Sequence, residues 1–235
     1  MISVLVPAYN EEKLLGSCLE SLAVQNPVPD EIVIVDNAST DRTPEIIKEF
    51  ITNHPELNVT AVYETKKGAP AAREAGWRAA HGDVIVMTDA DETFPVGWMA
   101  KVHAALAANP SVGAIGGAVR FQNAPPVINF IQFLFNLLYP RLVKLSKGFP
   151  YLIGGMTICR REVLEKMNGF VNGPENQLED YYLSEQAHKL GYKLRYMPGI
   201  YAIHSLRRYE VGGMAGFLQW GVAGVDSSKY TDDIR

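Results

Sequence analysis

Four short apolar runs in the N-terminal half constrain the fold of this chain more than any other feature. They occupy residues 2–6, 32–35, 59–63 and 84–87. Residues 32–35 and 84–87 are apolar at every position, and the other two runs each contain one polar residue, Ser3 and Thr60. Continuous apolar runs, rather than alternating ones, are typical of strands buried on both faces of a sheet. The stretches between them have helical character, and strands separated by helices form parallel sheets. The sequence therefore predicts an α/β fold with a mostly parallel central sheet flanked by helices.

Capping residues and composition predict the helices. Asn10-Glu11-Glu12 predicts a helix start, because Asn caps free N–H groups and acids favour the positive end of a helix. Thr43-Pro44-Glu45 predicts a second start. An alanine-rich helix is expected over residues 69–80. The C-terminal half is patterned less regularly; there we expect strands at 112–121, 193–197 and 201–204, helices at 127–145, 161–167 and 179–190, and a loop or strand from Gly154-Gly155.

Composition limits the class of protein. The 235 residues suit one large domain, and the 47% apolar fraction supplies a full core. A net charge of −4 without a basic run excludes a nucleic-acid-binding surface. Two cysteines, Cys18 and Cys159, form no disulfide framework and indicate a reducing compartment. No secretory signal opens the chain. We therefore expect a cytoplasmic protein, with the inner face of the membrane as an alternative site.

Residues 127–145 form the most apolar long stretch. Asn129, Gln132, Asn136, Pro140 and Arg141 interrupt it, so it is not predicted to span a membrane. The three amides share one helix face, and the rest of the circumference is largely Phe, Leu and Ile. A buried helix or a contact between two copies is one interpretation, and an interfacial helix touching a membrane or a lipid-linked acceptor is the other. Basic residues at only one end favour the first.

Polar residues follow three of the predicted strands, where parallel sheets bind ligands. Asp89 and Asp91 come directly after the fourth run. On an extended segment their carboxylates would point to the same side. Two hard oxygen ligands suit Mg²⁺ or Mn²⁺, with substrate phosphates completing the coordination. The sequence therefore predicts a divalent metal site here, the alternative being a solvated turn.

Residues after the first two strands fit a nucleotide. Asp36 can accept hydrogen bonds from a nucleobase, or it can form an Asx-turn with Asn37 and Ser39, and the two roles are compatible. Tyr9 can stack on a base or lie on the rim. Lys67 and Arg73 offer positive charge near a helix start, where diphosphates bind, or they lie on an ordinary solvated helix face.

Candidate groups in the C-terminal half are less specific. Glu179-Asp180 begins a predicted helix, where acids are common for stability, but either could serve as a general base. His204 ends a predicted strand and could be a third metal ligand or a structural histidine. Arg207 and Arg208 could hold phosphate.

Together these segments resemble the family 2 glycosyltransferases of the GT-A fold. The resemblance is carried by residues 4–12 (VLVPAYNEE), 33–41 (VIVDNASTD) and 82–91 (GDVIVMTDAD), and less specifically by Gly154-Gly155 and Glu179-Asp180. It covers roughly residues 1–205. It implies a single GT-A domain over residues 1–235, with a nucleotide-sugar-binding half at 1–120 and an acceptor-binding half at 121–235.

The resemblance also implies an activity: inverting transfer of a sugar from a nucleoside diphosphate sugar to a hydroxyl or lipid-phosphate acceptor, with UDP-sugars favoured and GDP-sugars as the alternative. Asp180 would be the catalytic base and Asp91 the main ligand of Mg²⁺ or Mn²⁺, joined by Asp89 and His204. The acceptor side would include Gly154, Gly155 and Glu179. The donor would be bound by Pro7, Ala8, Tyr9, Glu11, Asp36, Lys67, Arg73, Asp89 and Ala90.

The sequence departs from the family in lacking the C-terminal transmembrane helices of many lipid-acceptor members, which leaves the acceptor open. Two alternatives are a catalytically silent nucleotide-sugar-binding scaffold and a nucleotidyltransferase. The second would carry a glycine-rich basic loop after the first strand, where this chain has Pro7-Ala8-Tyr9-Asn10. The sequence has neither the glycine fingerprint of a dinucleotide-binding dehydrogenase nor a P-loop.

Overall fold

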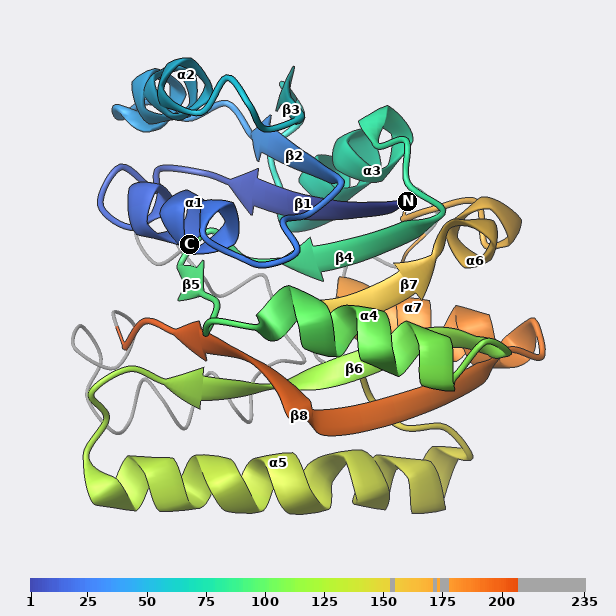
Figure 1. The fold of residues 1–235 in the computed structure, drawn as a ribbon. Coiled ribbons are helices and arrows are strands. Elements are labelled where there is room, and N and C mark those ends of the chain that lie inside the picture. Colours follow the sequence, from blue (N-terminus) through green and yellow to red (C-terminus); the bar gives the residue numbers. More distant parts are fainter. Residues whose placement is uncertain (153–154, 171–172, 174–177, 207–235) are drawn as a thin grey trace.

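One eight-stranded sheet runs through the molecule (Figure 1). The computed structural model describes residues 1–152, 155–170, 173 and 178–206. The strands are β1 (Ile2–Ala8), β2 (Glu31–Asp36), β3 (Val59–Tyr63), β4 (Val84–Thr88), β5 (Glu92–Thr93), β6 (Val112–Phe121), β7 (Met156–Arg160) and β8 (Lys193–His204). The helices are α1 (Leu15–Ala23), α2 (Thr43–Asn53), α3 (Ala69–Ala79), α4 (Trp98–Ala108), α5 (Pro126–Lys147), α6 (Arg161–Lys166) and α7 (Glu179–Lys189).

The strand order is β3-β2-β1-β4-β7-β6-β8-β5. Strands β3, β2, β1 and β4 are parallel, and so are β6 and β8, whereas β7 runs antiparallel between β4 and β6. The four runs thus form a parallel half-sheet in which β1, β2 and β4 are buried and β3 is a half-exposed edge strand. The predicted mostly parallel α/β fold is confirmed. Since β7 reverses direction, β1, β4, β6 and β8 all end at the same edge (Figure 1).

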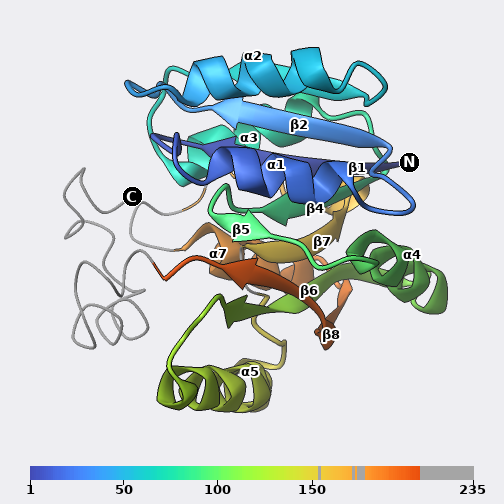
Figure 2. The ribbon, with the colours of Figure 1, turned by 60° about the vertical axis from the view of Figure 1, so that its left-hand side comes forward.

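Helices cover both faces of the sheet. One apolar core lies between the sheet and α1, α2 and α4, and a second lies under α3, α6 and α7. Figures 1 and 2 show α5 apart from these layers, at the end of the molecule beyond β6 and β8. Cys18 and Cys159 are buried and unpaired, as expected. Among the described helices none is both long and apolar enough to span a bilayer.

Several elements differ from the prediction. Helix α1 begins at Leu15 rather than at Asn10, and α4 and β5 were not predicted. Strand β7 is the strand alternative expected for the segment from Gly154-Gly155. Residues 193–204 form one strand instead of two, because β8 passes its irregular part beside Gly117 of β6. A Cβ at Gly117 would lie 2.5 Å from the backbone oxygen of Ile200. Glycine therefore allows the close approach that keeps β8 continuous.

Candidate active site

Loops from the first three strands are hydrogen-bonded to one another at the edge where those strands end. The Oδ1 atom of Asn10 accepts a hydrogen bond from the Thr40 N–H at 2.8 Å, and Ser39 Oγ accepts one from the Asn10 N–H at 3.0 Å. Thr43 Oγ1 accepts one from the Glu11 N–H at 2.8 Å. The prediction that Asn10 caps a helix is therefore wrong: its backbone is left-handed, with φ 54°, and its side chain bonds the neighbouring loop.

The loop after β2 contains the expected Asx-turn and a contact that the sequence did not predict. Asp36 is 5% exposed, and its Oδ1 accepts a hydrogen bond from the Ser39 N–H at 3.0 Å, which is the Asx-turn considered from the sequence. Asn37, which the sequence analysis assigned only to this turn, reaches the next loop. Its amide donates to the backbone oxygen of Lys66 at 2.7 Å and accepts from the Gly68 N–H at 2.8 Å. Asn37 thereby places the loop that carries Lys67.

Tyr9 and Lys67 meet at the mouth of these loops. The Lys67 ammonium lies 2.9 Å from the Tyr9 hydroxyl and 4.9 Å from the centre of its ring. Lys67 is exposed and Tyr9 half-buried. Among the other predicted donor residues Pro7 is half-buried, while Ala8 and Glu11 are buried below the loop. The predicted nucleoside-binding residues are thus gathered at one edge of the sheet.

The Asp89-Ala90-Asp91 segment is a turn between β4 and β5 rather than an extended strand. The Glu92 N–H donates to the backbone oxygen of Asp89 at 3.3 Å and closes the turn. The carboxylates therefore meet through a reversal of the chain and not through strand alternation. Ligand atoms of Asp89, Asp91 and His204 lie within 4.8 Å of one another.

His204 reaches this turn through tertiary pairing. It is the last residue of β8 and lies opposite Glu92 of β5. Its Nδ1 is 3.4 Å from Asp91 Oδ2 and 3.0 Å from the Ser205 backbone oxygen. Both His204 and Asp91 are buried, and Asp89 is half-buried. The three side chains predicted to bind metal are therefore adjacent.

Glu92 is a buried acid beside this cluster that the sequence analysis did not select. Its Oε2 accepts a hydrogen bond from the Asp89 N–H at 3.2 Å, and its buried Oε1 has no hydrogen-bond partner in the described structure. Burial, and then the charges of Asp89 and Asp91, raise the pKa of Glu92 well above its usual value. Gly155 passes directly against these carboxylates. A Cβ there would lie 2.4 Å from Glu92 Oε1 and 2.8 Å from Asp89 Oδ2.

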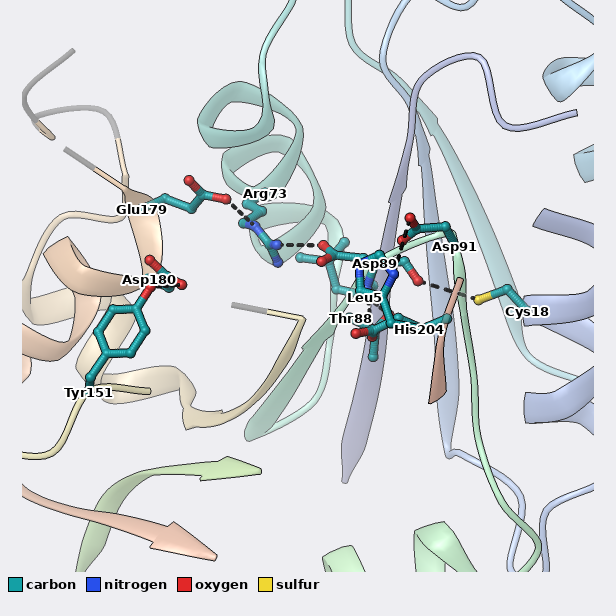
Figure 3. Close-up of polar contacts among 11 residues, drawn as sticks. Leu5, Cys18, Arg73, Thr88, Asp89, Asp91, Tyr151, Glu179, Asp180 and His204 are labelled. Carbon is teal, nitrogen blue, oxygen red and sulfur yellow. Dashed lines mark hydrogen bonds and ion pairs between the residues drawn. The ribbon is translucent and has the colours of Figure 1, made fainter. Parts of the chain in front are cut away.

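Arg73 joins the Asp89–Asp91 turn to α7. It is 3% exposed; its Nη2 lies 2.8 Å from Asp89 Oδ1 and its Nε 3.2 Å from Glu179 Oε1 (Figure 3). Burial opposes the charged form, but Asp89, Glu179 and Asp180 outweigh it and raise the pKa of Arg73. Arg73 therefore does not lie on a solvated helix face. Its buried Nη1 has no hydrogen-bond partner among the described residues.

Asp180 lies in the first turn of α7, where Tyr151 holds its side chain. The Tyr151 hydroxyl donates to Asp180 Oδ2 at 2.6 Å (Figure 3). Burial, followed by the Asp180 charge and this hydrogen bond, raises the pKa of Tyr151 well above its usual value, so Tyr151 remains a donor at neutral pH. Tyr139 packs edge-on against Tyr151 with ring centres 5.3 Å apart. No sequence motif marked Tyr151, because the contact depends on how α7 docks.

The described residues fit a divalent cation. Two carboxylates and an imidazole suit Mn²⁺, and Mg²⁺ can use the carboxylates together with substrate phosphates. The unpartnered Oε1 of Glu92 adds acceptor capacity beside them. Three predicted residues, Gly154, Arg207 and Arg208, lie outside the described residues.

Known proteins with similar sequences are glycosyltransferases. The chain is 28% identical over 207 residues to the probable glycosyltransferase YdaM of Bacillus subtilis, covering 84% of this chain and 49% of that one. It is 26% identical to the poly-beta-1,6-N-acetyl-D-glucosamine synthase of Staphylococcus epidermidis, covering 84% of this chain and 48% of that protein. The chain thus spans about half the length of these curated relatives.

Solved structures share the fold. The mannosyltransferase PcManGT of Pyrobaculum calidifontis, in complex with GDP-Man and Mn²⁺, matches with a TM-score of 0.67 and 30% identity over 86% of this chain and 56% of that one. S. aureus TarS 1–349 in complex with UDP-GlcNAc matches with a TM-score of 0.66 and 23% identity over 87% of this chain and 58% of that one. These matches confirm the GT-A fold. The model of glycosyl transferase family 2 matches residues 3–167, and the chain belongs to that family.

Proposed function

We propose that this chain is a metal-dependent inverting glycosyltransferase that moves one sugar from a nucleoside diphosphate sugar to a hydroxyl or lipid-phosphate acceptor. One observation carries the proposal: Asp89, Asp91 and His204 gather at the same sheet edge as the loops of Tyr9 and Asp36. That arrangement puts a site for a cation beside a site for a nucleoside. In the proposal residues 1–120 bind the donor and residues 121–235 supply the acceptor side.

The donor side takes a nucleotide through the loops after β1, β2 and β3. Asp36 and Tyr9 receive the base, by hydrogen bonding and stacking, and Lys67 and Arg73 add positive charge toward the diphosphate. Bonds from Asn10 and Asn37 hold these loops in place before any ligand arrives. UDP-sugars are favoured from the sequence, while the complexes of similar proteins, with GDP-Man in one and UDP-GlcNAc in another, support testing both nucleotides.

A cation at Asp91, Asp89 and His204 would supply positive charge to the leaving diphosphate, as Lewis-acid metals do. Mn²⁺ is the first cation to test, since the PcManGT complex contains it. The Nη1 atom of Arg73 has no hydrogen-bond partner among the described residues, whereas Nε and Nη2 bond Glu179 and Asp89. Nη1 can therefore donate a hydrogen bond to the leaving diphosphate. The chain thus offers two sources of charge stabilisation for the leaving group.

Asp180 is the base in this proposal. As the acceptor oxygen bonds to the anomeric carbon, the bond from that carbon to the diphosphate breaks and the acceptor proton passes to Asp180. Tyr151 holds one oxygen of the carboxylate at 2.6 Å and so limits its rotation. Gly155 and Glu179 belong to the acceptor side in this proposal. The pairing of Glu179 with Arg73 fixes the first turn of α7 relative to the donor site.

A thermal-shift panel tests the donor and the metal together. UDP-, GDP- and dTDP-sugars are added with and without Mn²⁺, because a ligand that binds only the folded state raises its melting temperature. We expect a Mn²⁺-dependent rise with one nucleotide, which Asp91→Asn removes. Asp83→Asn is the matched control, since Asp83 is exposed and pairs with the N-terminal amine.

The outcomes separate the alternatives. A shift for one nucleoside diphosphate sugar that depends on Mn²⁺ and on Asp91 supports the proposal and names the base. If Asp91→Asn kept the same thermal shift, donor binding would not depend on a metal held by Asp91. A shift without turnover of any acceptor would favour a silent nucleotide-sugar-binding scaffold, and pyrophosphate release from a sugar phosphate and a nucleoside triphosphate would identify a nucleotidyltransferase.

A further inference from the structure

Helix α5 buries polar side chains and exposes apolar ones, which is the reverse of an ordinary surface helix. Its polar residues face the protein: Gln132 and Asn136 are 7% and 8% exposed, and both amides donate to the backbone oxygen of Val119, at 3.2 and 2.9 Å. Ile128 and Pro140 extend the same buried face. The two amides therefore share one strand carbonyl as their acceptor, and the rest of the helix faces outward.

The outward face of α5 is apolar. Phe130 and Phe133 are each 60% exposed, and Leu145 is 85% exposed. The other exposed apolar residues on this helix are Val127, Leu137, Leu138, Tyr139 and Leu142. Isolated apolar side chains on a surface are ordinary. A continuous row of them along a 22-residue helix marks a site of contact with a membrane or another protein. Figures 1 and 2 show α5 at one end of the molecule, with no other labelled helix or strand outside it.

The charged residues of α5 itself have a single sign. The sequence contains no Asp or Glu from residue 93 to residue 161. Arg141, Lys144 and Lys147 are exposed on the C-terminal half of the helix. An apolar face bordered by cations is the composition of helices that lie in the interface of a bilayer with anionic lipids.

A basic cavity continues this charge beyond the helix. It has a volume of about 570 Å³ and lies between the end of α5 and the starts of β6 and β8. Lys144, His188, Lys193 and Arg195 are among its lining residues, and none of the described residues that line it is acidic. A cavity of this size and sign accepts an anionic group such as the phosphate of a lipid headgroup.

We propose that α5 is a peripheral membrane helix that binds a bilayer containing anionic lipids. Its outer face enters the boundary of the acyl chains, and Arg141, Lys144 and the basic cavity contact headgroup phosphates. Anionic lipids of this kind are found in the cytoplasmic leaflet of cell membranes. This role does not require the proposed transfer reaction, although α5 adjoins the candidate active site where Tyr139 packs against Tyr151.

Arg141 argues for a bilayer rather than for a second copy of the chain. It lies four residues from both Leu137 and Leu145, in the middle of the apolar face. A symmetric contact between two copies of α5 would bury this guanidinium in both, while residues 93–161 offer no acid to pair with it. At a bilayer, the long side chain keeps its apolar stem among the acyl chains and its charge among the phosphates.

Vesicle sedimentation tests the proposal with the full chain and no nucleotide. We expect the protein to pellet with vesicles of phosphatidylglycerol and phosphatidylcholine, and at least about fivefold more weakly with phosphatidylcholine alone, since each basic residue near the surface adds roughly this factor. The double variant Phe130→Ser and Phe133→Ser should weaken binding by about tenfold or more. Lys144→Gln should reduce it by about fivefold.

Matched controls keep the result interpretable. Val24→Ser removes an apolar side chain that is 63% exposed elsewhere, and Lys48→Gln removes an exposed lysine of α2; both should bind vesicles like the wild type. Melting temperatures establish that each variant is folded. Equal pelleting with both kinds of vesicle, or wild-type binding by the α5 variants, would overturn the proposal. A dimer in solution that the Phe130 and Phe133 variant dissociates, together with no vesicle binding, would instead assign this face to self-association.

Discussion

At the residue scale, the contact between Tyr151 and Asp180 is the clearest feature of the proposed reaction. The hydroxyl lies 2.6 Å from one carboxylate oxygen in a buried setting. Tyr151 and Asp180 bond each other, whereas Arg73 and Glu179 connect α7 with the Asp89–Asp91 turn. Substitutions at Asp180 and Tyr151 should therefore separate turnover from donor binding.

We predict that Asp180→Asn leaves the donor-induced thermal shift intact but lowers kcat by about a hundredfold or more, as expected for loss of a general base. Tyr151→Phe should lower kcat less, by about tenfold, because it removes one hydrogen bond to a charged group. Tyr192→Phe is the matched control, since its hydroxyl bonds Lys166 on the surface. Steady-state kinetics with the donor identified by thermal shift measure these effects. Wild-type kcat in Asp180→Asn would show that another residue is the base.

At the element scale, Glu31 holds the start of the parallel half-sheet together. Its side chain is 1% exposed and accepts hydrogen bonds from Ser3 of β1 at 2.5 Å and from the His81 N–H at 2.8 Å. Burial opposes the charged form of Glu31, but the hydrogen bonds from His81 and Ser3 outweigh it and lower the pKa. One carboxylate thus links β2, β1 and the segment that leads into β4.

We predict that Glu31→Gln lowers the melting temperature at pH 7 by about 4–8 °C, which corresponds to roughly 2 kcal/mol for hydrogen bonds to a charged group in a chain of this size. Because the folded pKa of Glu31 is lowered, its stabilisation is present above the unfolded value of about 4.3 and is lost as pH falls through the folded pKa. The difference between variant and wild type should therefore shrink toward pH 3.

Thermal melts of both proteins across this pH range measure the effect. Glu49→Gln is the control, because Glu49 is exposed and its nearest cation, Arg42, is 3.8 Å away. That variant should melt like the wild type at every pH. A deficit in Glu31→Gln that stays constant down to pH 3 would contradict the linkage to the carboxylate charge.

At the scale of the whole molecule, Arg73 ties the N-terminal half of the chain to the C-terminal half. It extends from α3, close to the N-terminal loops, and pairs with Asp89 of the turn after β4 and with Glu179 of α7. Its partners are less buried than it is, with Asp89 35% exposed. Removing Arg73 would leave two acids, together with Asp180, without their common cation.

We predict that Arg73→Gln destabilises the protein by about 2–3 kcal/mol, somewhat less than the loss of one partner from a fully buried ion pair. That change lowers the melting temperature by about 4–12 °C. Arg78→Gln on the same helix is the control: its bond to Glu74 is exposed, so the loss should stay below about 1 kcal/mol. Equal losses in the two variants would show that Arg73 does not stabilise the junction between the halves.

The sequence by itself determined the parallel half-sheet and the residues at its edge. The runs that became β1, β2 and β4 are continuous and largely apolar, and their burial on both faces follows directly from that local pattern. The run that became β3 is half-exposed, because β3 lies at the edge of the sheet. Asp36 and Asp89 lie at or just after strand ends, so their position at the ligand-binding edge also followed from local order. Turns were less predictable: Asn10 has the composition of a helix cap but bonds a neighbouring loop.

Only the tertiary structure decided how the second half completes the site. His204 reaches Asp91 because β8 pairs with β5, and Tyr151 reaches Asp180 because α7 packs beside it. The burial of Gln132 in α5 depends on its hydrogen bond to the Val119 carbonyl of β6. Each contact joins segments far apart in the chain, and the free energy that selects it comes from pairing and burial between elements. A periodicity within one segment carries no information on that choice.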